Sequence, residues 1–189
     1  MVAPGYEVII LGNSSVGKSS LLSCYVNGKI PEESQPTVGV EFLVKTIAEP
    51  EINAKLKIWD TAGQKRFRDI LRKNYTNFPG ALLVYDIHNR DSYDAVQEWT
   101  LELTARKVIP RIVIALVGHQ ADVLEDRVVA TEEAERFAKR NGLIFWETSS
   151  VTNLNVNRCF MDVAIGIRNA RICSCFEALL HKKQSNWYL

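Results

Sequence analysis

Eight consecutive residues near the amino terminus have the types and spacing needed to hold a phosphate chain. They read Gly12-Asn13-Ser14-Ser15-Val16-Gly17-Lys18-Ser19, follow a short apolar run, and open a stretch with helical periodicity. The two glycines allow a tight turn whose backbone N–H groups point inward, and the following helix adds partial positive charge at its N-terminus. Lysine supplies a point charge for the terminal phosphates, and the serine hydroxyl is a ligand for Mg²⁺. The residues predicted to bind the nucleotide here are Gly12, Ser14, Ser15, Val16, Gly17, Lys18, Ser19 and Ser20.

A carboxylate, a glycine and an amide follow a second apolar run. Asp60 ends that run, and Gly63 and Gln64 come shortly after it. At the carboxyl edge of an α/β sheet, Asp60 is placed to hold Mg²⁺ through water, and the Gly63 N–H is placed to reach a γ-phosphate. Gln64 is suited to orient an attacking water. We therefore expect triphosphate hydrolysis, with Lys18 and Gln64 as the catalytic residues.

A sheet is needed to bring these loops together, and the apolar runs predict one. The expected strands are residues 6–11, 56–59, 81–85, 112–117 and 143–146. Several are apolar throughout, as in parallel sheets that are covered by helices on both faces. The stretches with helical periodicity are residues 17–27, 91–107, 131–141 and about 155–181.

One pair of apolar runs cannot be parallel. Residues 41–47 and 52–59 are joined by only Ala48-Glu49-Pro50-Glu51, which is too short for a crossover helix. A hairpin follows, with an antiparallel strand at the edge. The sequence therefore predicts an α/β fold, with a mostly parallel six-stranded sheet, one antiparallel edge strand, and helices on both faces.

Composition indicates one ordinary globular domain. The chain has 189 residues, with 23 lysines and arginines against 22 aspartates and glutamates. A net charge of +1 argues against nucleic-acid binding, which needs a clear basic excess on one face. The four cysteines lack the paired spacing of a zinc site or a disulfide scaffold, which favours a reduced, cytoplasmic protein. No apolar run approaches the roughly 18 residues of a membrane span.

Together these motifs resemble those of the small GTPases of the Ras superfamily, and of its Rab branch in particular. The resemblance covers about residues 6–168 and implies a P-loop NTPase fold over residues 1–172, a helical extension and tail over 173–189, and GTP or GDP bound with Mg²⁺. The resemblance rests on the loop at 12–19 and on four further segments whose sequences are similar to those of Rab proteins. These segments are Pro36-Thr37-Val38-Gly39-Val40-Glu41-Phe42, Lys55-Leu56-Lys57-Ile58-Trp59-Asp60, Arg66-Phe67-Arg68 and Leu83-Val84-Tyr85-Asp86-Ile87.

The resemblance also implies how the terminal phosphate controls the protein. Thr37 closes over Mg²⁺ and the γ-phosphate, so that Ser19, Thr37 and Asp60 form the expected metal set. Residues 30–42 and 61–76 become two switch segments, which relax when hydrolysis removes their tether. Effectors, an exchange factor and a GTPase-activating protein are the implied partners. No arginine finger is identified in the chain, so intrinsic hydrolysis is expected at about 10⁻⁴ s⁻¹.

The residues expected to contact the guanine base depart from the family pattern. His119-Gln120-Ala121-Asp122 stands where a Rab reads Asn-Lys-x-Asp, and only the aspartate is kept. The Asp122 carboxylate can accept hydrogen bonds from guanine N1–H and the 2-amino group, whereas adenine offers neither donor. His119 is interpreted either as a base contact or as a solvated residue at a strand end.

Two further base contacts are altered. Ile30 stands where the family has a phenylalanine, and Val151 replaces the lysine of a Glu-Thr-Ser-Ala-Lys motif, read here as Glu147-Thr148-Ser149-Ser150-Val151. Ser149 is assigned to the nucleotide site, and the Ser150 N–H can still reach the base carbonyl. Each lost stacking contact is worth roughly 1 to 3 kcal/mol, so we expect a weakened pocket and fast nucleotide exchange.

Surface and membrane contacts are altered too. Phe42 and Trp59 occupy two places of the aromatic triad by which Rab proteins meet effectors, and Asn74 occupies the third. Packing of the hairpin explains Phe42 and Trp59 equally well. The last residues carry no prenylation cysteine, which predicts a cytoplasmic protein with at most peripheral attachment to endomembranes.

Three functions are compatible with these motifs. A guanine-nucleotide switch in vesicle or membrane traffic fits them best, and a scaffold of the same fold with weak nucleotide binding or hydrolysis fits the altered base pocket. A P-loop kinase fits the phosphate loop alone, because its arginine-bearing lid has no counterpart in residues 30–42. Nucleotide content of the purified protein separates the first two.

Overall fold

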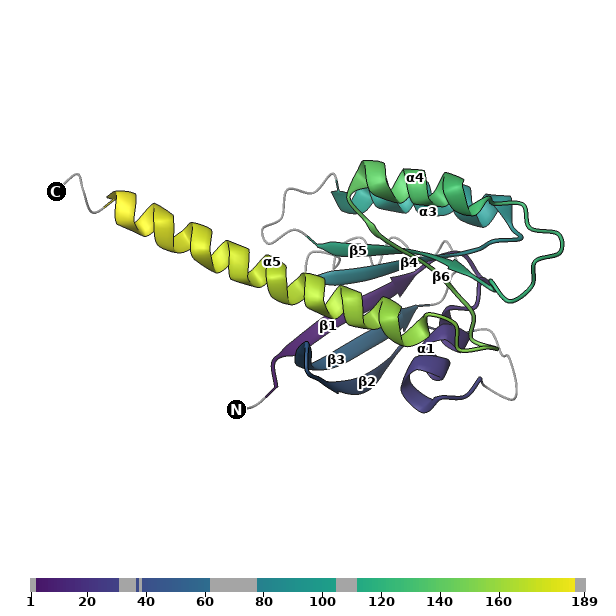
Figure 1. Ribbon diagram of the computed structural model, residues 1–189, viewed down its shortest axis with the longest axis horizontal. Helices are drawn as coiled ribbons and strands as arrows, with labels where there is room; N and C mark the ends of the chain where they lie inside the picture. Colours follow the sequence, from purple (N-terminus) through teal and green to yellow (C-terminus); the bar gives the residue numbers. More distant parts are fainter. Residues whose placement is uncertain (1–2, 31–36, 38, 62–77, 105–111, 186–189) are drawn as a thin grey trace.

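Strands and helices follow one another in the alternating order that the sequence predicts (Figure 1). The computed structural model describes residues 3–30, 37, 39–61, 78–104 and 112–185, and from residue 176 onward it describes the course of the helix alone. The elements are β1 (Gly5–Leu11), α1 (Lys18–Asn27), β2 (Val40–Glu49), β3 (Ile52–Thr61), β4 (Gly80–Asp86), α3 (Arg90–Thr104), β5 (Val113–His119), α4 (Thr131–Asn141), β6 (Ile144–Thr148) and α5 (Val156–Ser185).

The strands form a six-stranded sheet in the order β2-β3-β1-β4-β5-β6. Every neighbouring pair is parallel except β2 and β3, which are antiparallel. Glu49 pairs with Ile52 across the hairpin, so the turn needs only Pro50 and Glu51. The predicted sheet is confirmed, including its antiparallel edge strand, and both strands of the hairpin are longer than expected.

Helices cover both faces of the sheet (Figure 1), because its central strands are apolar on both sides. Val8 and Ile10 of β1 lie in one buried cluster with residues of α1 and α5. Ile9 and Leu11 point the other way, into a second cluster with residues of α3 and α4. All four side chains are at most 1% exposed, and each such burial contributes roughly 1.5 to 3 kcal/mol. These two cores fix the strand ends that carry the site.

The longest of the described helices, α5, extends well beyond the sheet (Figure 1). Its 30 residues run four residues further than predicted and pass without a break through the expected boundary at residue 172. The Arg168 guanidinium donates a hydrogen bond to the Glu51 carbonyl in the hairpin turn. The Arg171 guanidinium lies 4.7 Å from the centre of the Tyr6 ring. These contacts fasten α5 to the amino-terminal edge of the sheet.

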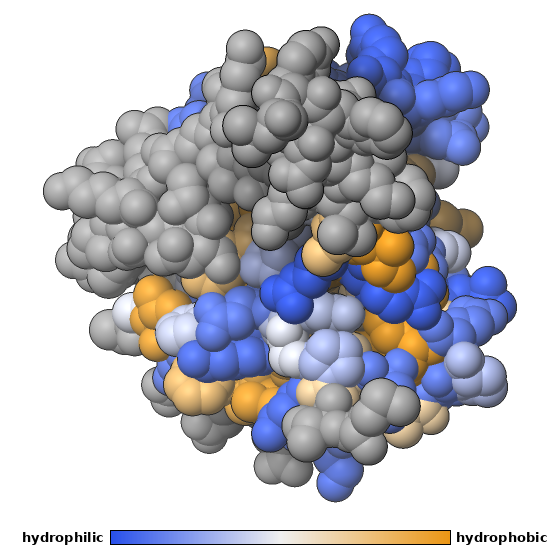
Figure 2. All heavy atoms as spheres, turned by 90° about the vertical axis from the view of Figure 1, so that its left-hand side faces the viewer, coloured by the Kyte–Doolittle hydropathy of each residue, from blue (hydrophilic) through white to orange (hydrophobic). Residues whose placement is uncertain are grey.

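The surface around the projecting part of α5 is mixed in character. On the face toward which α5 points, the described residues form separate apolar patches between hydrophilic ones (Figure 2). Ile172, Cys173 and Cys175 are exposed on the helix itself. Among the described helices, none combines the length and the apolar character required to cross a membrane.

Candidate functional site

The carboxyl ends of the parallel strands lie side by side at one edge of the sheet. Ile10 lies beside Asp60 in the register, Asp86 lies beside His119, and His119 lies beside Thr148. Ligands of α/β proteins bind at this edge. Three loops that leave it are named here the phosphate loop (residues 12–19), the base loop (residues 120–123) and the serine loop (residues 149–155).

The phosphate loop turns over the end of β1 on two glycines. Gly12 has a φ of 150° and packs so closely on β4 that an added Cβ would lie 2.2 Å from the Val84 carbonyl oxygen. Gly17 has a φ of 89° and forms the N-cap of α1. Residues with a side chain rarely adopt such a backbone. The loop therefore requires glycine at both positions, as the motif predicts.

Lys18 is buried at the centre of this loop. Its Nζ donates hydrogen bonds to the carbonyl oxygens of Gly12 at 3.1 Å and Asn13 at 2.7 Å. Burial lowers the pKa of Lys18 to about 8, and the nearby Asp60 carboxylate opposes part of that shift. Phosphate oxygens at this loop would favour the charged ammonium. The predicted role of Lys18 therefore fits its position.

The oxygen atoms of the predicted metal set converge. The Ser19 hydroxyl donates to Asp60 Oδ2 and lies 2.8 Å from Thr37 Oγ1, which is itself 3.5 Å from the same Oδ2. Asp60 Oδ1 is buried and has no hydrogen-bond partner among the described residues. Burial raises the pKa of Asp60, while the Ser19 hydrogen bond and the Lys18 charge oppose that rise.

This donor set fits Mg²⁺ and no softer metal. Hydroxyl and carboxylate oxygens are the ligands of hard cations, and Mg²⁺ usually completes its shell with water and substrate phosphates. Within the described ranges no group of three His, Cys, Asp or Glu side chains gathers as a separate metal site. Ser19, Thr37 and Asp60 would hold the ion, and the ion would neutralise charge on the terminal phosphates.

His119 ends β5 and is buried where the three loops meet. Its Nδ1 lies 2.9 Å from Thr148 Oγ1, and its Nε2 lies 3.1 Å from Ser150 Oγ. A Cβ added at Gly17 would lie 2.4 Å from His119 Cδ2, so the ring also packs directly on the phosphate loop. The residue is only 3% exposed. It is therefore not a solvated residue at a strand end, and its assignment as a base contact stays a prediction.

Acid should destabilise the protein through His119. Burial lowers the pKa of His119 from 6.5 to about 4, against the raising effect of Asp122 and Asp86. The unfolded chain then binds a proton that the folded chain excludes, so this stability is present above pH 6.5 and is lost as the pH falls toward 4. The loss amounts to roughly 3 kcal/mol at most.

Urea unfolding at pH 7 and pH 4.5 measures this loss of stability. The difference in unfolding free energy between the two pH values should be smaller for His119→Asn than for the parent. An equal difference in both proteins would contradict the assignment.

Hydrogen bonds fix the base loop at the two residues that precede Asp122. Gln120 has a φ of 66°, and its side-chain amide donates to Asp86 Oδ2 at 2.8 Å. The Ala121 N–H donates to the Thr148 carbonyl at 3.1 Å. Asp122 is half-buried, and its carboxylate has no hydrogen-bond partner within the described part of the chain. That carboxylate is therefore available to donors on a base.

The serine loop uses its side chains to hold its own turn. The Ser149 hydroxyl accepts hydrogen bonds from the N–H groups of Val151 and Thr152, both at 3.1 Å. Ser149 is fully buried, which favours a supporting role over direct contact with the nucleotide. Val151 is 71% exposed and Ile30 is 40% exposed. The altered base contacts are thus aliphatic side chains at the surface.

Several predicted residues lie outside the described part of the chain. They are Gly63, Gln64, Asn74 and most of the two expected switch segments, namely residues 31–36, 38 and 62–76. Their roles stay predictions.

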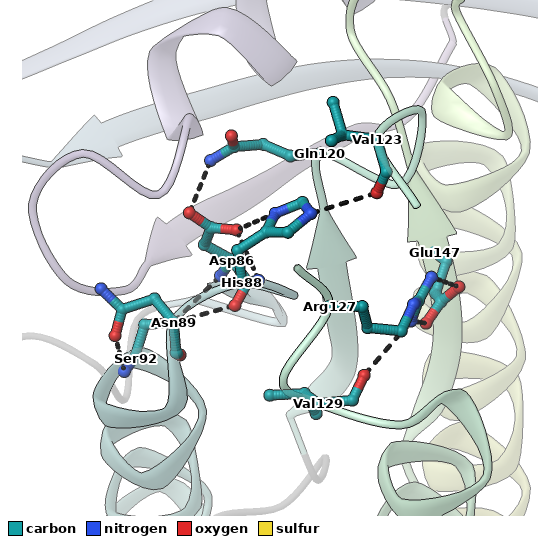
Figure 3. A network of polar contacts seen from close by, with 9 residues as sticks. All are labelled: Asp86, His88, Asn89, Ser92, Gln120, Val123, Arg127, Val129 and Glu147. Carbon is teal, nitrogen blue, oxygen red and sulfur yellow. Dashed lines mark hydrogen bonds and ion pairs between the residues drawn. The ribbon is translucent and has the colours of Figure 1, made fainter. Parts of the chain in front are cut away.

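Sequence reasoning missed a network of polar side chains beside the base loop (Figure 3). Asp86 accepts hydrogen bonds from the backbone N–H of His88 at 2.9 Å and from Gln120. Further along, Arg127 donates to both carboxylate oxygens of Glu147, at 2.6 and 3.0 Å. The available signal was the position of Asp86, a carboxylate at the end of a buried strand, as Asp60 is.

A third aromatic residue was also missed on the hairpin surface. Phe42 and Trp59 pack with ring centres 5.1 Å apart, and Phe78 packs edge-on against Trp59 at 6.1 Å. The Lys57 ammonium lies 4.5 Å from the Phe42 ring centre and 4.1 Å from the Trp59 ring centre. Phe42 is 50% exposed, so packing accounts for only part of this aromatic cluster.

Comparison with known proteins agrees with this geometry. Residues 7–169 match the profile of the Ras family. The chain is also 40% identical over 159 residues to the Ras-related protein Rab-5A of Dictyostelium discoideum, covering 84% of this chain and 79% of that protein. The chain belongs to the Ras family and is a Rab-like small GTPase, which binds GTP or GDP with Mg²⁺ and hydrolyses GTP to GDP.

Proposed function

We propose that this guanine-nucleotide switch regulates vesicle or membrane traffic from the cytoplasm and attaches peripherally to endomembranes. One observation carries the switch mechanism, namely the convergence of Ser19, Thr37 and Asp60 beside the buried Lys18. The likeness to Rab-5A supports the assignment to membrane traffic. Rab-like GTPases generally interact with effectors, exchange factors and GTPase-activating proteins.

Thr37 couples the nucleotide to the shape of the protein. It lies far from Ser19 in the sequence, and its described polar contacts are to Ser19 and Asp60. The Thr37 hydroxyl would be held in this place by the charge that Mg²⁺ and a γ-phosphate supply when they are bound. Loss of the γ-phosphate weakens that hold, and residues 30–42 and 61–76 change the surface that they offer to partners.

The aromatic cluster Phe42, Trp59 and Phe78 is the surface on which we expect effectors to bind. Phe42 belongs to the first expected switch segment, and half of its side chain is exposed, so a partner could bury its ring. The Lys57 ammonium, which packs on Phe42 and Trp59, is paired with Glu7 at 3.5 Å. An effector that binds this aromatic cluster needs a surface complementary to it in shape and charge.

Nucleotide counting tests the function as a whole. The purified protein is denatured, its nucleotide is identified and quantified, and labelled GDP is then titrated with and without Mg²⁺. The switch predicts one GDP per chain and weaker binding without Mg²⁺. A scaffold of the same fold, which the altered base contacts favour, predicts an empty pocket in both titrations.

Nucleotide release should be faster than in an ordinary Rab protein, because the base lacks its usual stacking partners. Val151→Lys should then slow GDP release about tenfold, since an alkyl stem stacking on the base regains roughly 1 to 2 kcal/mol. Displacement of labelled GDP measures the rate. Val128→Lys, at another exposed valine, is the matched control and should leave release unchanged. A parent protein that releases GDP as slowly as an ordinary Rab would contradict the weakened pocket.

Gln64→Leu separates hydrolysis from binding. A leucine cannot orient the attacking water, so single-turnover GTP hydrolysis should fall more than about tenfold. GDP affinity should change by less than about threefold, because the role given to Gln64 involves the γ-phosphate side alone. Equal losses in hydrolysis and in GDP affinity would refute that role.

A further inference from the structure

His88 lies between the end of β4 and the base loop, and no motif of the nucleotide site includes it. Its Nδ1 is 3.0 Å from Asp86 Oδ1, and its Nε2 is 3.1 Å from the Val123 carbonyl oxygen (Figure 3). Asp86 and His88 are each less than one-fifth exposed in their side chains. The ring thus spans from one segment to the other in a partly shielded place.

The hydrogen-bond partners of His88 determine which protonation state of its ring fits between Asp86 and Val123. A carboxylate and a carbonyl oxygen are both acceptors, so each ring nitrogen must donate to satisfy its partner. Only the imidazolium form carries a proton on both nitrogens, and a neutral ring leaves one lone pair facing an acceptor. His119 differs, because its partners are the hydroxyls of Thr148 and Ser150, which can donate as well as accept.

The bridge bears directly on the residue that selects the base. Gln120 binds Asp86 on one side of Asp122, and His88 binds Val123 on the other side. Gln120 thus contacts the Asp86 carboxylate directly, and Val123 is linked to the same carboxylate through His88. Asp122 lies between Gln120 and Val123 in the chain. Losing either contact frees one flank of Asp122 to move.

We infer that protonated His88 is a positioning residue, which fixes the base loop against β4 so that the protein releases GDP more slowly as the pH falls from 8 to 5.5. The inference rests on the proposed nucleotide function. Histidine is the side chain that generally changes its charge in this range. Restoring one hydrogen bond at the loop should slow release about threefold to tenfold.

Among the residues that the structure describes, the other charged groups of the surrounding elements make no hydrogen bond or ion pair with the His88 ring. The base loop carries Asp122, and the acidic residues that follow it in the chain are exposed. At the start of α3, Arg90 donates to Asp94 and to both carboxylate oxygens of Glu133. In the loop before α4, Arg127 is likewise occupied by Glu147.

Release of labelled GDP, measured from pH 8 to 5.5, tests the inference. GDP phosphates titrate in the same range, so the quantity of interest is the ratio of the His88→Asn rate to the parent rate at each pH. This ratio should rise about threefold to tenfold toward pH 5.5, because only the parent gains the second hydrogen bond. His181→Asn, at another histidine on the projecting part of α5, should give a ratio near one throughout.

A second variant and NMR spectra test the protonation of His88 separately. His88→Lys places a permanently charged donor at this position and should release GDP slowly at both ends of the range. Long-range ¹H–¹⁵N spectra of the parent should show both His88 nitrogens protonated at pH 5.5. A ratio that stays flat, or a neutral His88 at pH 5.5, overturns the inference while GDP binding still supports the switch. No GDP binding at any pH would overturn the proposed function as well.

Discussion

Asp122→Asn is expected to change the preferred base from guanine to xanthine. The asparagine amide can accept from N1–H, but its NH₂ group would face the 2-amino group of guanine, donor against donor. Xanthine carries a carbonyl at that position, which the same NH₂ group can satisfy. Hydrogen bonds to a charged group are worth roughly 1.5 to 3 kcal/mol each, so GDP affinity should fall about 10²- to 10⁴-fold.

Displacement of labelled GDP by unlabelled GDP or xanthosine diphosphate measures this change. The parent should prefer GDP, and the variant should prefer xanthosine diphosphate. Glu125→Gln removes a carboxylate from an exposed residue three positions further on and should leave the preference unchanged. A variant that loses both ligands equally would show that Asp122 supports the loop and does not read the base.

Gly17→Ala is expected to abolish tight nucleotide binding. The new Cβ would lie 2.4 Å from Cδ2 and 2.9 Å from Nε2 of His119, and the φ of 89° would strain any side chain. His119 cannot yield easily, because Thr148 and Ser150 engage its two nitrogens. The phosphate loop or the base side must therefore shift, and GDP release should accelerate by at least about 10²-fold.

A second glycine provides a matched control. Gly28 ends α1 with a φ of 68°, and an added Cβ would meet nothing within 4 Å. Gly28→Ala should cost about 1 kcal/mol of stability and leave GDP release nearly unchanged. Gly17→Ala combined with His119→Ala should regain part of the unfolding free energy that Gly17→Ala loses. Strictly additive losses in the double variant would contradict a clash between the two residues.

The sheet and the phosphate loop could be predicted because local patterns determine them. The apolar run of β1 shows by itself that the strand is buried on both faces, and the short link at residues 48–51 requires a hairpin. The Gly12-to-Ser19 motif likewise contains within eight residues the backbone freedom, the charge and the hydroxyl that the site needs. The predicted convergence of Ser19 and Asp60 then follows from adjacent strand ends.

The base side could not be predicted to the same depth, because its contacts join distant segments. His119 is buried by Gly17 of the phosphate loop, by Thr148 at the end of β6 and by Ser150 of the serine loop, and nothing next to it in the sequence indicates this. Gln120 stands where the family has a lysine, and its αL backbone directs the side-chain amide to Asp86. Side-chain direction at such positions depends on partners that only the folded chain assembles.

The length of α5 sets a distance. Beyond the sheet α5 continues as a projecting helix (Figure 1). Arg171 still contacts Tyr6 of β1, and the helix ends fourteen residues later at Ser185. At about 1.5 Å per residue the helix reaches about 21 Å beyond Arg171. A helix resists bending far more than an extended linker does. A partner that binds the outer end of α5 would therefore lie at a set distance from the nucleotide-binding part of the protein, and in a defined orientation to it.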